Sequence, residues 1–237
     1  MKYFPNNKLS TYTTKLHTPL RLQGEWEVSL VEINYPRTWY NISGDTAKIK
    51  YKGKSTDRVH TVSLTPGYYE DEHEILTELR TIIPGSAQRQ INLYVKAQSR
   101  KFVINLTHGA TIEFHDSLAR MLGLEVSGTI SKNTVGSFPI DIHRGFYTFY
   151  VYSDLVNAQY VGDSLSPLLR TVDVDHSEIG GMVCRTYNSP HYLPIKTKYI
   201  ETIKVDIRRD IGELVPFESG QVICKLHFRL KRSPYLM

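Results

Sequence analysis

The chain has 237 residues, 41% of them hydrophobic, with sixteen tyrosines, two cysteines and a formal net charge of +5. A chain of this length can bury a core without disulfide bonds, and Cys184 and Cys224 are too few for a disulfide framework. The start MKYFPNNKLS lacks the apolar segment of a signal peptide, and no apolar run reaches the ~20 residues of a membrane helix. The composition argues against a disulfide-stapled secreted domain and against a helical membrane protein. It predicts a protein that is not secreted by a signal peptide.

Hydrophobic residues alternate with polar ones along the first part of the chain, which is the pattern of half-buried β-strands. A first strand is predicted over residues 11–16. A longer one follows in WEVSLVEINY, where the apolar residues change phase at Val31. A change of phase predicts a β-bulge, or a strand that passes between two sheets.

Two segments repeat their apolar residues with the period of a helix instead. In EDEHEILTELRTII, Asp71 and Glu74 have the spacing of a capping box, and Pro84 stops the helix shortly after its last apolar residue. In HDSLARMLGL, Asp116 is expected to cap the helix and Gly123 to follow its C-terminus. We expect one or two short helices in the connections between strands.

The rest of the chain reads as further short strands separated by turn-forming residues. Residues 125–144 show little pattern and are expected to form a long exposed loop. There is no series of strand–helix–strand units and no linker, so a parallel sheet is not expected and residues 1–237 are predicted to form a single all-β domain. Further strands are predicted at 47–51, 59–64, 91–95, 102–106, 111–114, 146–152, 168–174, 182–187, 202–208 and 221–230.

One stretch, VGDSLSPLLRTVDVDH, contains the G-D-S-L nucleophile signature of a family of serine esterases, followed by D-x-x-H. A hydrolase would use Ser164 as nucleophile, His176 as base and Asp173 to orient the base. In that family the signature lies near the N-terminus of a doubly wound α/β fold, whereas here it lies two-thirds along a chain of strands. We therefore interpret the stretch as a turn at Gly162 followed by a strand.

A second candidate for chemistry is a non-haem iron site. His176, Glu178 and His227 have the order of the facial triad that iron dioxygenases carry on a double-stranded β-helix. Aspartate is more usual than glutamate in such a triad, and His227 falls on the polar face of its predicted strand. No phosphate-binding loop, dinucleotide fingerprint or zinc motif occurs. We expect no catalytic residue, no metal ligand and no cofactor, with an iron dioxygenase as the alternative.

Four blocks of the sequence carry a family resemblance. They are FPNNKLSTYTTKLHTPLRLQGEWEVSLVEINYPRTWYNI, LTPGYYEDEHEILTELR, FYVYSDLVNAQYVGDSLSPLLRTV and IETIKVDIRRDIGELVPFESGQVICKLHFRL, and the similarity runs from about Leu9 to Arg232. In this order they resemble the minor capsid (penton) protein of Polinton, or Maverick, elements and of adintovirus-like viruses.

The resemblance implies a single jelly roll, with two packed antiparallel sheets in Greek-key order and no catalysis. It implies a homopentamer at the five-fold vertices of an icosahedral capsid, beside trimers of a double-jelly-roll major capsid protein. The protein would be made in the nucleus or cytoplasm of the host cell and located in the virion capsid. A receptor-binding or carbohydrate-binding jelly roll is a further alternative.

Two surfaces are candidates for contacts in such a capsid. A five-fold ring joins two different surfaces of each subunit, and aromatic residues are enriched at interfaces. The candidate subunit interface lies in the strand GFYTFYVYSD and consists of Tyr147, Phe149, Tyr150 and Tyr152. From Lys196 onward the chain has nine Lys and Arg against five Asp and Glu. The candidate face for packaged DNA or an acidic capsid neighbour consists of Arg208, Arg209, Lys231 and Arg232.

Overall fold

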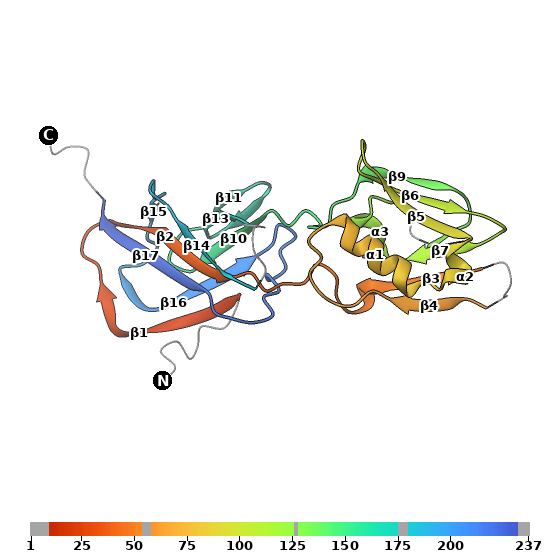
Figure 1. Ribbon diagram of the computed structural model, residues 1–237. Helices are drawn as coiled ribbons and strands as arrows, with labels where there is room; N and C mark the ends of the chain where they lie inside the picture. Colours follow the sequence, from red (N-terminus) through yellow and green to blue (C-terminus); the bar gives the residue numbers. More distant parts are fainter. Residues whose placement is uncertain (1–9, 54–57, 126–127, 175–179, 232–237) are drawn as a thin grey trace. The chain divides into compact units, whose positions relative to one another are not determined.

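The computed structural model describes residues 10–53, 58–125, 128–174 and 180–231 (Figure 1). The chain forms two compact units, unit 1 from Met1–Trp39 and Phe146–Met237 and unit 2 from Tyr40–Gly145. The prediction of a single domain over residues 1–237 is corrected accordingly. The boundary carries no linker signal because Trp39 and Phe146, where the chain leaves and re-enters unit 1, are buried aromatic residues whose rings lie 5.1 Å apart.

Unit 1 contains two antiparallel sheets (Figure 1). The strand order of the first sheet is β1 (Thr11–Arg21), β16 (Tyr199–Arg208), β10 (Thr148–Ser153), β13 (Leu168–Asp173). In the second sheet β2 (Trp26–Pro36) pairs with β14 (Met182–Thr186), β15 (Leu193–Pro194) and β17 (Ile223–Leu230). A separate hairpin consists of β11 (Gln159–Val161) and β12 (Ser164–Ser166).

Alternating hydrophobic residues turn one face of each sheet toward the core of unit 1. Phe149 and Val151 of β10, with Val205 and Ile207 of β16, are at most 2% exposed. Tyr35 of β2 reaches this layer from the second sheet, and its ring meets the Phe149 ring edge to face with centroids 5.0 Å apart. Aromatic pairs of this geometry contribute about 0.5–1.5 kcal/mol beyond the area they bury. The contact therefore helps to hold the two sheets together.

The phase change at Val31 is a β-bulge, as the sequence predicted. In the ladder between β2 and β17, Leu30 pairs with Leu226 and Glu32 pairs with Lys225, so Val31 is an extra residue on β2. The extra residue lets β2 keep apolar side chains in the core on both sides of the bulge. The other interpretation, a strand that passes between two sheets, is not needed because β2 stays in one sheet.

The predicted all-β class, a jelly roll with packed antiparallel sheets, is confirmed. β1 and β2 follow each other in the chain but lie in different sheets, and so do β16 and β17. Because β1 pairs with β16 and β2 pairs with β17, strands from the two ends of the chain lie side by side in both sheets. Pairing between strands so distant in sequence is typical of Greek-key arrangements.

Unit 2 has its own hydrophobic core between two smaller antiparallel sheets and three helices. One sheet has the order β4 (His60–Ser63), β3 (Lys48–Lys52), β7 (Thr111–Phe114), β8 (Gly128–Ile130). The other has the order β5 (Ile91–Lys96), β6 (Lys101–Leu106), β9 (Thr134–Pro139). The helices are α1 (Glu72–Ile82), α2 (Gly85–Gln88) and α3 (Asp116–Met121), with a 3-10 turn η1 (Gly44–Ala47).

The helix signals in the sequence are largely confirmed. The Asp71 side chain caps α1 by accepting a hydrogen bond of 2.9 Å from the Glu74 amide. In α3 the cap is His115 and not Asp116 as expected, because the helix starts one residue earlier. Gly123 follows the C-terminus of α3 with φ +74°, as predicted. The described residues contain three helices where one or two were expected.

The exposed loop predicted for residues 125–144 is corrected as well. This stretch contains β8 and β9, which pair with β7 and β6. The sequence signal is weak because both are edge strands of their sheets, and β9 includes Gly136 and Pro139. An edge strand has one partner and a largely exposed side, so its residues need not alternate between polar and apolar.

Candidate functional site

A pocket of about 530 Å³ on unit 1 brings together three features that the sequence singled out. It is formed by β10, β16, the β11–β12 hairpin and the turn that follows β16. The pocket is lined by Tyr150, Tyr152, Val161, Gly162, Asp163, Ser164, Ser166, Pro167, Asp206, Arg208, Arg209, Asp210 and Gly212. The tyrosine-rich strand, the G-D-S-L stretch and part of the basic C-terminal segment thus line one pocket.

Two tyrosines of β10 contribute its aromatic surface. Tyr150 and Tyr152 are two residues apart on a strand, so they project to the same face, opposite to buried Phe149. Their rings are stacked with centroids 6.4 Å apart. Burial raises the pKa of the Tyr152 hydroxyl, the neighbouring Tyr150 adds to this, and Arg208 opposes it. Tyr152 is therefore neutral at physiological pH, and the pair offers apolar ring surface with two hydroxyl groups.

The neighbouring strand β16 contributes charged groups of both signs. Arg208 pairs across the ladder with Tyr150, and its guanidinium donates to the backbone oxygen of Gly212 at 2.7 Å. Asp206 lies 3.9 Å from the Arg208 guanidinium and 3.3 Å from the Lys204 ammonium. The pocket lining contains three aspartates and two arginines. This lining is not a positive surface, so the pocket itself does not favour an anion.

The β11–β12 hairpin does not have the local geometry that an esterase nucleophile at Ser164 would need. Val161 pairs with Ser164, so Gly162 and Asp163 form a two-residue turn, with Gly162 at φ +62°. The Ser164 hydroxyl donates to the Asp163 carboxylate at 3.2 Å. An esterase nucleophile of this class would stand on a turn between a strand and a helix, whereas here a strand precedes and follows the turn. The predicted turn and the strand after it, β13, are confirmed, while His176 lies outside the described residues.

The same hairpin carries an exposed apolar pair that the sequence analysis missed. Tyr160 and Leu165 face each other across the hairpin and are 82% and 62% exposed. An apolar pair that faces water buries little surface and so adds little to the stability of the hairpin. Apolar residues that cluster on a surface mark interaction sites. The two strands of the hairpin have three residues each, which is too short for hydrophobic periodicity to distinguish them from a loop.

The four residues of the candidate subunit interface divide between surface and core. Tyr147 is 50% exposed, and Tyr150 and Tyr152 are partly exposed in the pocket. Phe149 is 0% exposed. Its place in the candidate interface is therefore corrected: its ring packs between the sheets against Tyr35 and cannot reach a neighbouring subunit.

The four residues of the candidate anionic-partner face do not lie together. Arg208 and Arg209 line the pocket at the end of β16, and the Arg209 guanidinium also lies 4.9 Å from the Phe146 ring. Lys231 follows β17 and belongs to a different pocket, with Lys196 as a neighbour. Arg232 lies outside the described residues. The prediction of one continuous basic face, made from nearness in sequence, is therefore corrected.

The iron-site alternative rests on residues that are mostly not described. His176 and Glu178 lie outside the described residues, and His227 contacts the Tyr192 hydroxyl at 2.6 Å through its Nδ1. Among the residues that the structure describes, no group of three or more His, Cys, Asp or Glu is arranged to hold a metal ion.

Within the same residues, no helix has the length and apolar character to cross a membrane.

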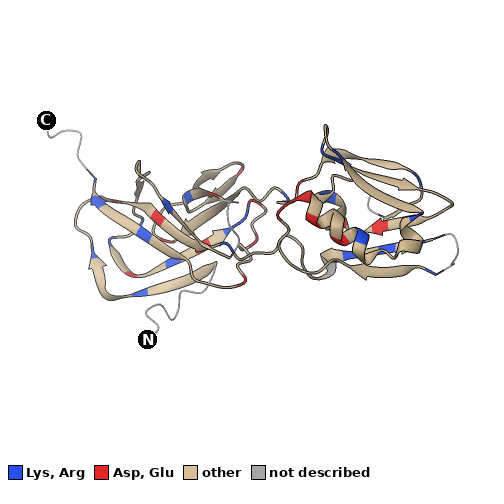
Figure 2. Ribbon diagram, viewed as in Figure 1, with Lys and Arg blue, Asp and Glu red and all other residues tan. Residues whose placement is uncertain are grey.

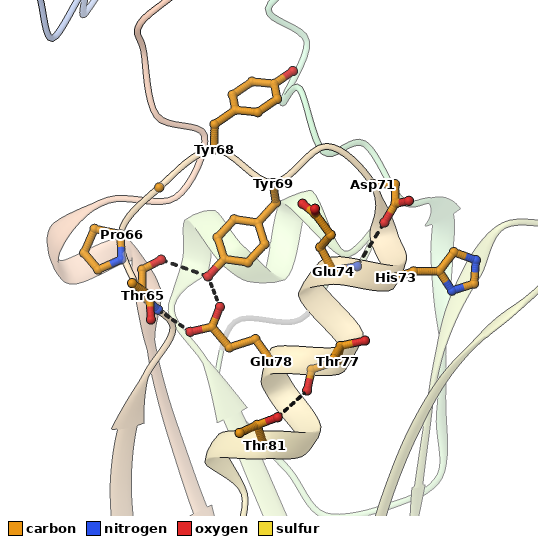
Figure 3. A pocket seen from close by; sticks show the side chains of 11 residues that line it. Thr65, Pro66, Tyr68, Tyr69, Asp71, His73, Glu74, Thr77, Glu78 and Thr81 are labelled. Atoms are coloured by element: carbon orange, nitrogen blue, oxygen red, sulfur yellow. Dashed lines mark hydrogen bonds between the residues drawn. The ribbon is translucent and has the colours of Figure 1, made fainter. Parts of the chain in front are cut away.

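Unit 2 has a pocket of about 680 Å³ beside α1 (Figure 3). The Tyr69 hydroxyl lies against the Glu78 carboxylate and 2.8 Å from the Thr65 backbone oxygen. Glu78 also accepts from the Thr65 amide at 2.6 Å. Burial would raise the pKa of Glu78, but the hydrogen bonds from Tyr69 and Thr65 outweigh it and lower the pKa. Figure 3 shows His73 and Glu78 extending in different directions, so the two do not form an acid–base pair. The network ties the loop before α1 to the helix.

The comparisons with known proteins give one informative result. No protein-family model matches the sequence, and no curated protein matches it. The structure is similar to the crystal structure of the mavirus penton protein, with a TM-score of 0.50 and 13% sequence identity. The similarity covers 94% of this chain and 91% of that chain, so it spans both units. At this identity the likeness shows a shared fold.

Proposed function

We propose that the protein is a structural minor capsid (penton) protein that forms homopentamers at the five-fold vertices of an icosahedral capsid. The observation that carries the proposal is the shared fold with the mavirus penton protein over nearly the full length of both chains. The four-block resemblance to penton proteins of Polinton elements and adintovirus-like viruses supports the same role independently of the structure. In this role the protein is located in the virion capsid, contacts a double-jelly-roll major capsid protein, and has no enzymatic activity.

The surface of unit 1 offers a candidate for one of the two patches that a five-fold ring requires. In a closed ring each subunit presents one patch to the neighbour on one side and a different patch to the neighbour on the other side. The exposed pair Tyr160 and Leu165 supplies a projecting apolar patch. Tyr147 supplies half-exposed aromatic surface, and Tyr150 and Tyr152 supply the aromatic lining of the pocket. Because the hairpin and two of these tyrosines line one pocket, we propose that they form one of the two patches and contact the same neighbour.

The oligomeric state tests this role directly. Mass measurement in solution, by light scattering and native mass spectrometry, together with negative-stain imaging should show pentamers and rings with five-fold symmetry. Addition of the major capsid protein should incorporate the pentamer into closed particles. A strict monomer at high concentration, and in the presence of the major capsid protein, would contradict the proposal. Stoichiometric iron in the purified protein, lost on His176→Ala substitution, would instead favour the dioxygenase alternative.

The hairpin contact has its own matched test. Tyr160→Ser with Leu165→Ser removes two exposed apolar side chains and should shift pentamers toward monomers without loss of thermal stability, because exposed side chains contribute little to folding. The control replaces Met182 and Leu230, which are 57% and 54% exposed on the second sheet, and should leave pentamers intact. Equal effects of the two double variants would remove the hairpin from the interface.

A further inference from the structure

A second pocket of unit 1, of about 270 Å³, gathers lysines that are scattered in the sequence. Its lining includes Lys196, Lys198 and Lys231, together with Glu25 and Trp26. Three chain segments meet there: the β1–β2 connection, the segment 194–198 from the end of β15 toward β16, and the residue that follows β17. The pocket thus joins lysines that lie more than thirty positions apart in the sequence.

Backbone hydrogen bonds hold these three segments in place. The Leu22 amide donates to the Lys198 oxygen at 2.8 Å, and the Lys231 amide donates to the Glu25 oxygen at 2.8 Å. The amide of residue 195 donates to the Trp26 oxygen at 2.9 Å. The lysine side chains therefore extend from a fixed frame, and a ligand would not have to order the backbone when it binds.

The charges at this pocket differ from those on the neighbouring sheet surface. Along β2 and β17 the cations are paired: the Arg229 guanidinium lies 2.8 Å from Glu27, and the Lys225 ammonium lies 3.7 Å from Glu32. Figure 2 shows Lys and Arg distributed over the strands of unit 1, while Asp and Glu gather at the start of α1 in unit 2.

At the pocket itself this pairing is mostly missing. Lys196 and Lys198 are exposed and form no ion pair with any residue that the structure describes, and the same is true of Arg21 beside them. Lys231 pairs with Glu25 at 3.1 Å, but Glu25 is 78% exposed, so that pair is weak. The pocket and its rim carry four cationic groups against one carboxylate. A surface of this composition attracts anions.

The lysine pocket lies at the far end of unit 1 from Arg208. Tyr199 pairs with Arg21 at the beginning of β16, whereas Arg208 is the last residue of the same strand. Ten residues of strand at ~3.3 Å each separate the two ends by about 30 Å. Trp39 and Phe146, where the chain leaves and re-enters unit 1, contact the Arg208 end through Arg209. The lysines therefore form a separate site at the opposite end of the sandwich.

We infer that Arg21, Lys196, Lys198 and Lys231 form a binding site for the phosphate backbone of double-stranded nucleic acid. The inference rests on the proposed capsid role, in which a surface that attracts anions can meet the packaged genome. Lysine ammonium groups are compact point charges that neutralise phosphates without reading bases. Trp26 donates its indole N–H to the Gln23 oxygen at 2.8 Å, so the indole donor is occupied within the chain. The site therefore suits sequence-independent contact.

The expected strength follows from the number of phosphates contacted. Each neutralised phosphate on duplex DNA contributes about −0.9 to the slope of log K against log salt. Four cations predict a slope of about −3.6, so a change from about 50 to 200 mM salt should weaken binding ~100-fold. Loss of two cations should reduce the slope to about −1.8 and the weakening to ~10-fold.

The test measures binding of a fluorescein-labelled DNA duplex to the full-length protein by anisotropy over a series of salt concentrations. Lys196→Gln with Lys198→Gln should reduce the slope by about half. The matched control, Lys50→Gln with Lys225→Gln, removes the same charge from lysines that are paired with the less exposed carboxylates of Glu113 and Glu32, and should leave the slope unchanged. An equal change in both double variants would show that only net charge matters and would overturn the site.

Three outcomes distinguish the phosphate site from the capsid role and from an acidic protein partner. A steep slope that depends on Lys196 and Lys198, in a protein that never forms pentamers or enters capsids, would support the phosphate site and contradict the vertex function. Pentamers whose DNA binding is insensitive to these two lysines would support the vertex function and contradict the phosphate site. Polyglutamate that competes as effectively as DNA of equal charge would show an acidic protein partner and overturn the nucleic-acid assignment.

Discussion

The face that β10 turns toward the core can be tested by truncation of Phe149. Its side chain is 0% exposed, and its ring meets the Tyr35 ring edge to face at 5.0 Å, across the space between the two sheets of unit 1. Phe149→Ala removes the ring from a closed interior and leaves a cavity that the sheets can fill only in part. The loss falls on unit 1, since both rings belong to it.

The loss of folding stability expected for Phe149→Ala follows from the burial of its ring and from its contact with the Tyr35 ring. Truncation of a buried phenylalanine to alanine costs about 3–5 kcal/mol, and loss of the edge-to-face contact is included in the upper part of that range. At roughly 2–4 °C per kcal/mol for a chain of this size, the transition of unit 1 should fall by about 10 °C. Tyr147→Ala, at a half-exposed position just before β10, should cost less than about 1 kcal/mol.

Differential scanning calorimetry of the two variants beside the parent protein measures both effects. The reasoning would be refuted by a loss below about 1 kcal/mol for Phe149→Ala, or by an equal loss for Tyr147→Ala. A small loss for Phe149→Ala would mean that β10 presents its other face to the core. Tyr150 and Tyr152 would then be core residues, and the tyrosine-lined pocket would not be available to a neighbouring subunit.

Three further changes test other parts of the structure. Gly123 has φ +74°, and Gly123→Ala would place a Cβ against a backbone carbonyl oxygen of β9, so it should cost at least about 2 kcal/mol. Gly109 has φ +77° but open space around it, so Gly109→Ala should cost less, and urea unfolding measures the difference. Ser164→Ala should leave the background hydrolysis of p-nitrophenyl acetate and the melting temperature unchanged, and a drop in hydrolysis would revive the esterase interpretation. Because the folded pKa of Glu78 is lowered, its stabilisation of unit 2 is present above its unfolded pKa of about 4.3 and is lost as pH falls through the folded value. The stability gap between parent and Glu78→Gln should therefore close in acid, and a gap that is independent of pH would contradict the hydrogen bonds from Tyr69.

Local features of the fold could be predicted from the sequence because their causes are local. The phase change at Val31 became a bulge, since one extra residue is what moves the apolar positions to the other register. Asp71 capped α1, because the cap depends only on the spacing of an acceptor and the amides of the first turn. Gly162 formed the turn before β12, since its backbone takes a left-handed conformation that suits glycine.

Features that depend on contacts between distant segments could not be predicted in the same way. Alternation in β10 shows that its two faces differ, but both faces are aromatic, so only packing against Tyr35 places Phe149 inside. Arg209 and Lys231 both belong to the basic C-terminal segment, yet they lie at opposite ends of unit 1. The reason is that β17 runs back along unit 1 and ends beside the β1–β2 connection, where β16 begins. The two edge strands of unit 2 between residues 125 and 144 carry too little alternation to be recognised.

The sequence by itself determined the all-β class, most of the strand positions, the cap of α1 and the turn at Gly162 that replaces an esterase nucleophile. Each of these follows from hydrophobic period or from the backbone preference of one or two residues. The tertiary structure alone decided that the chain forms two units, that the hairpin and the stacked tyrosines meet in one pocket, and that three lysines share another. The physical reason is that β-sheet partners are distant in sequence, so their pairing depends on the packing of the whole core and not on any local pattern.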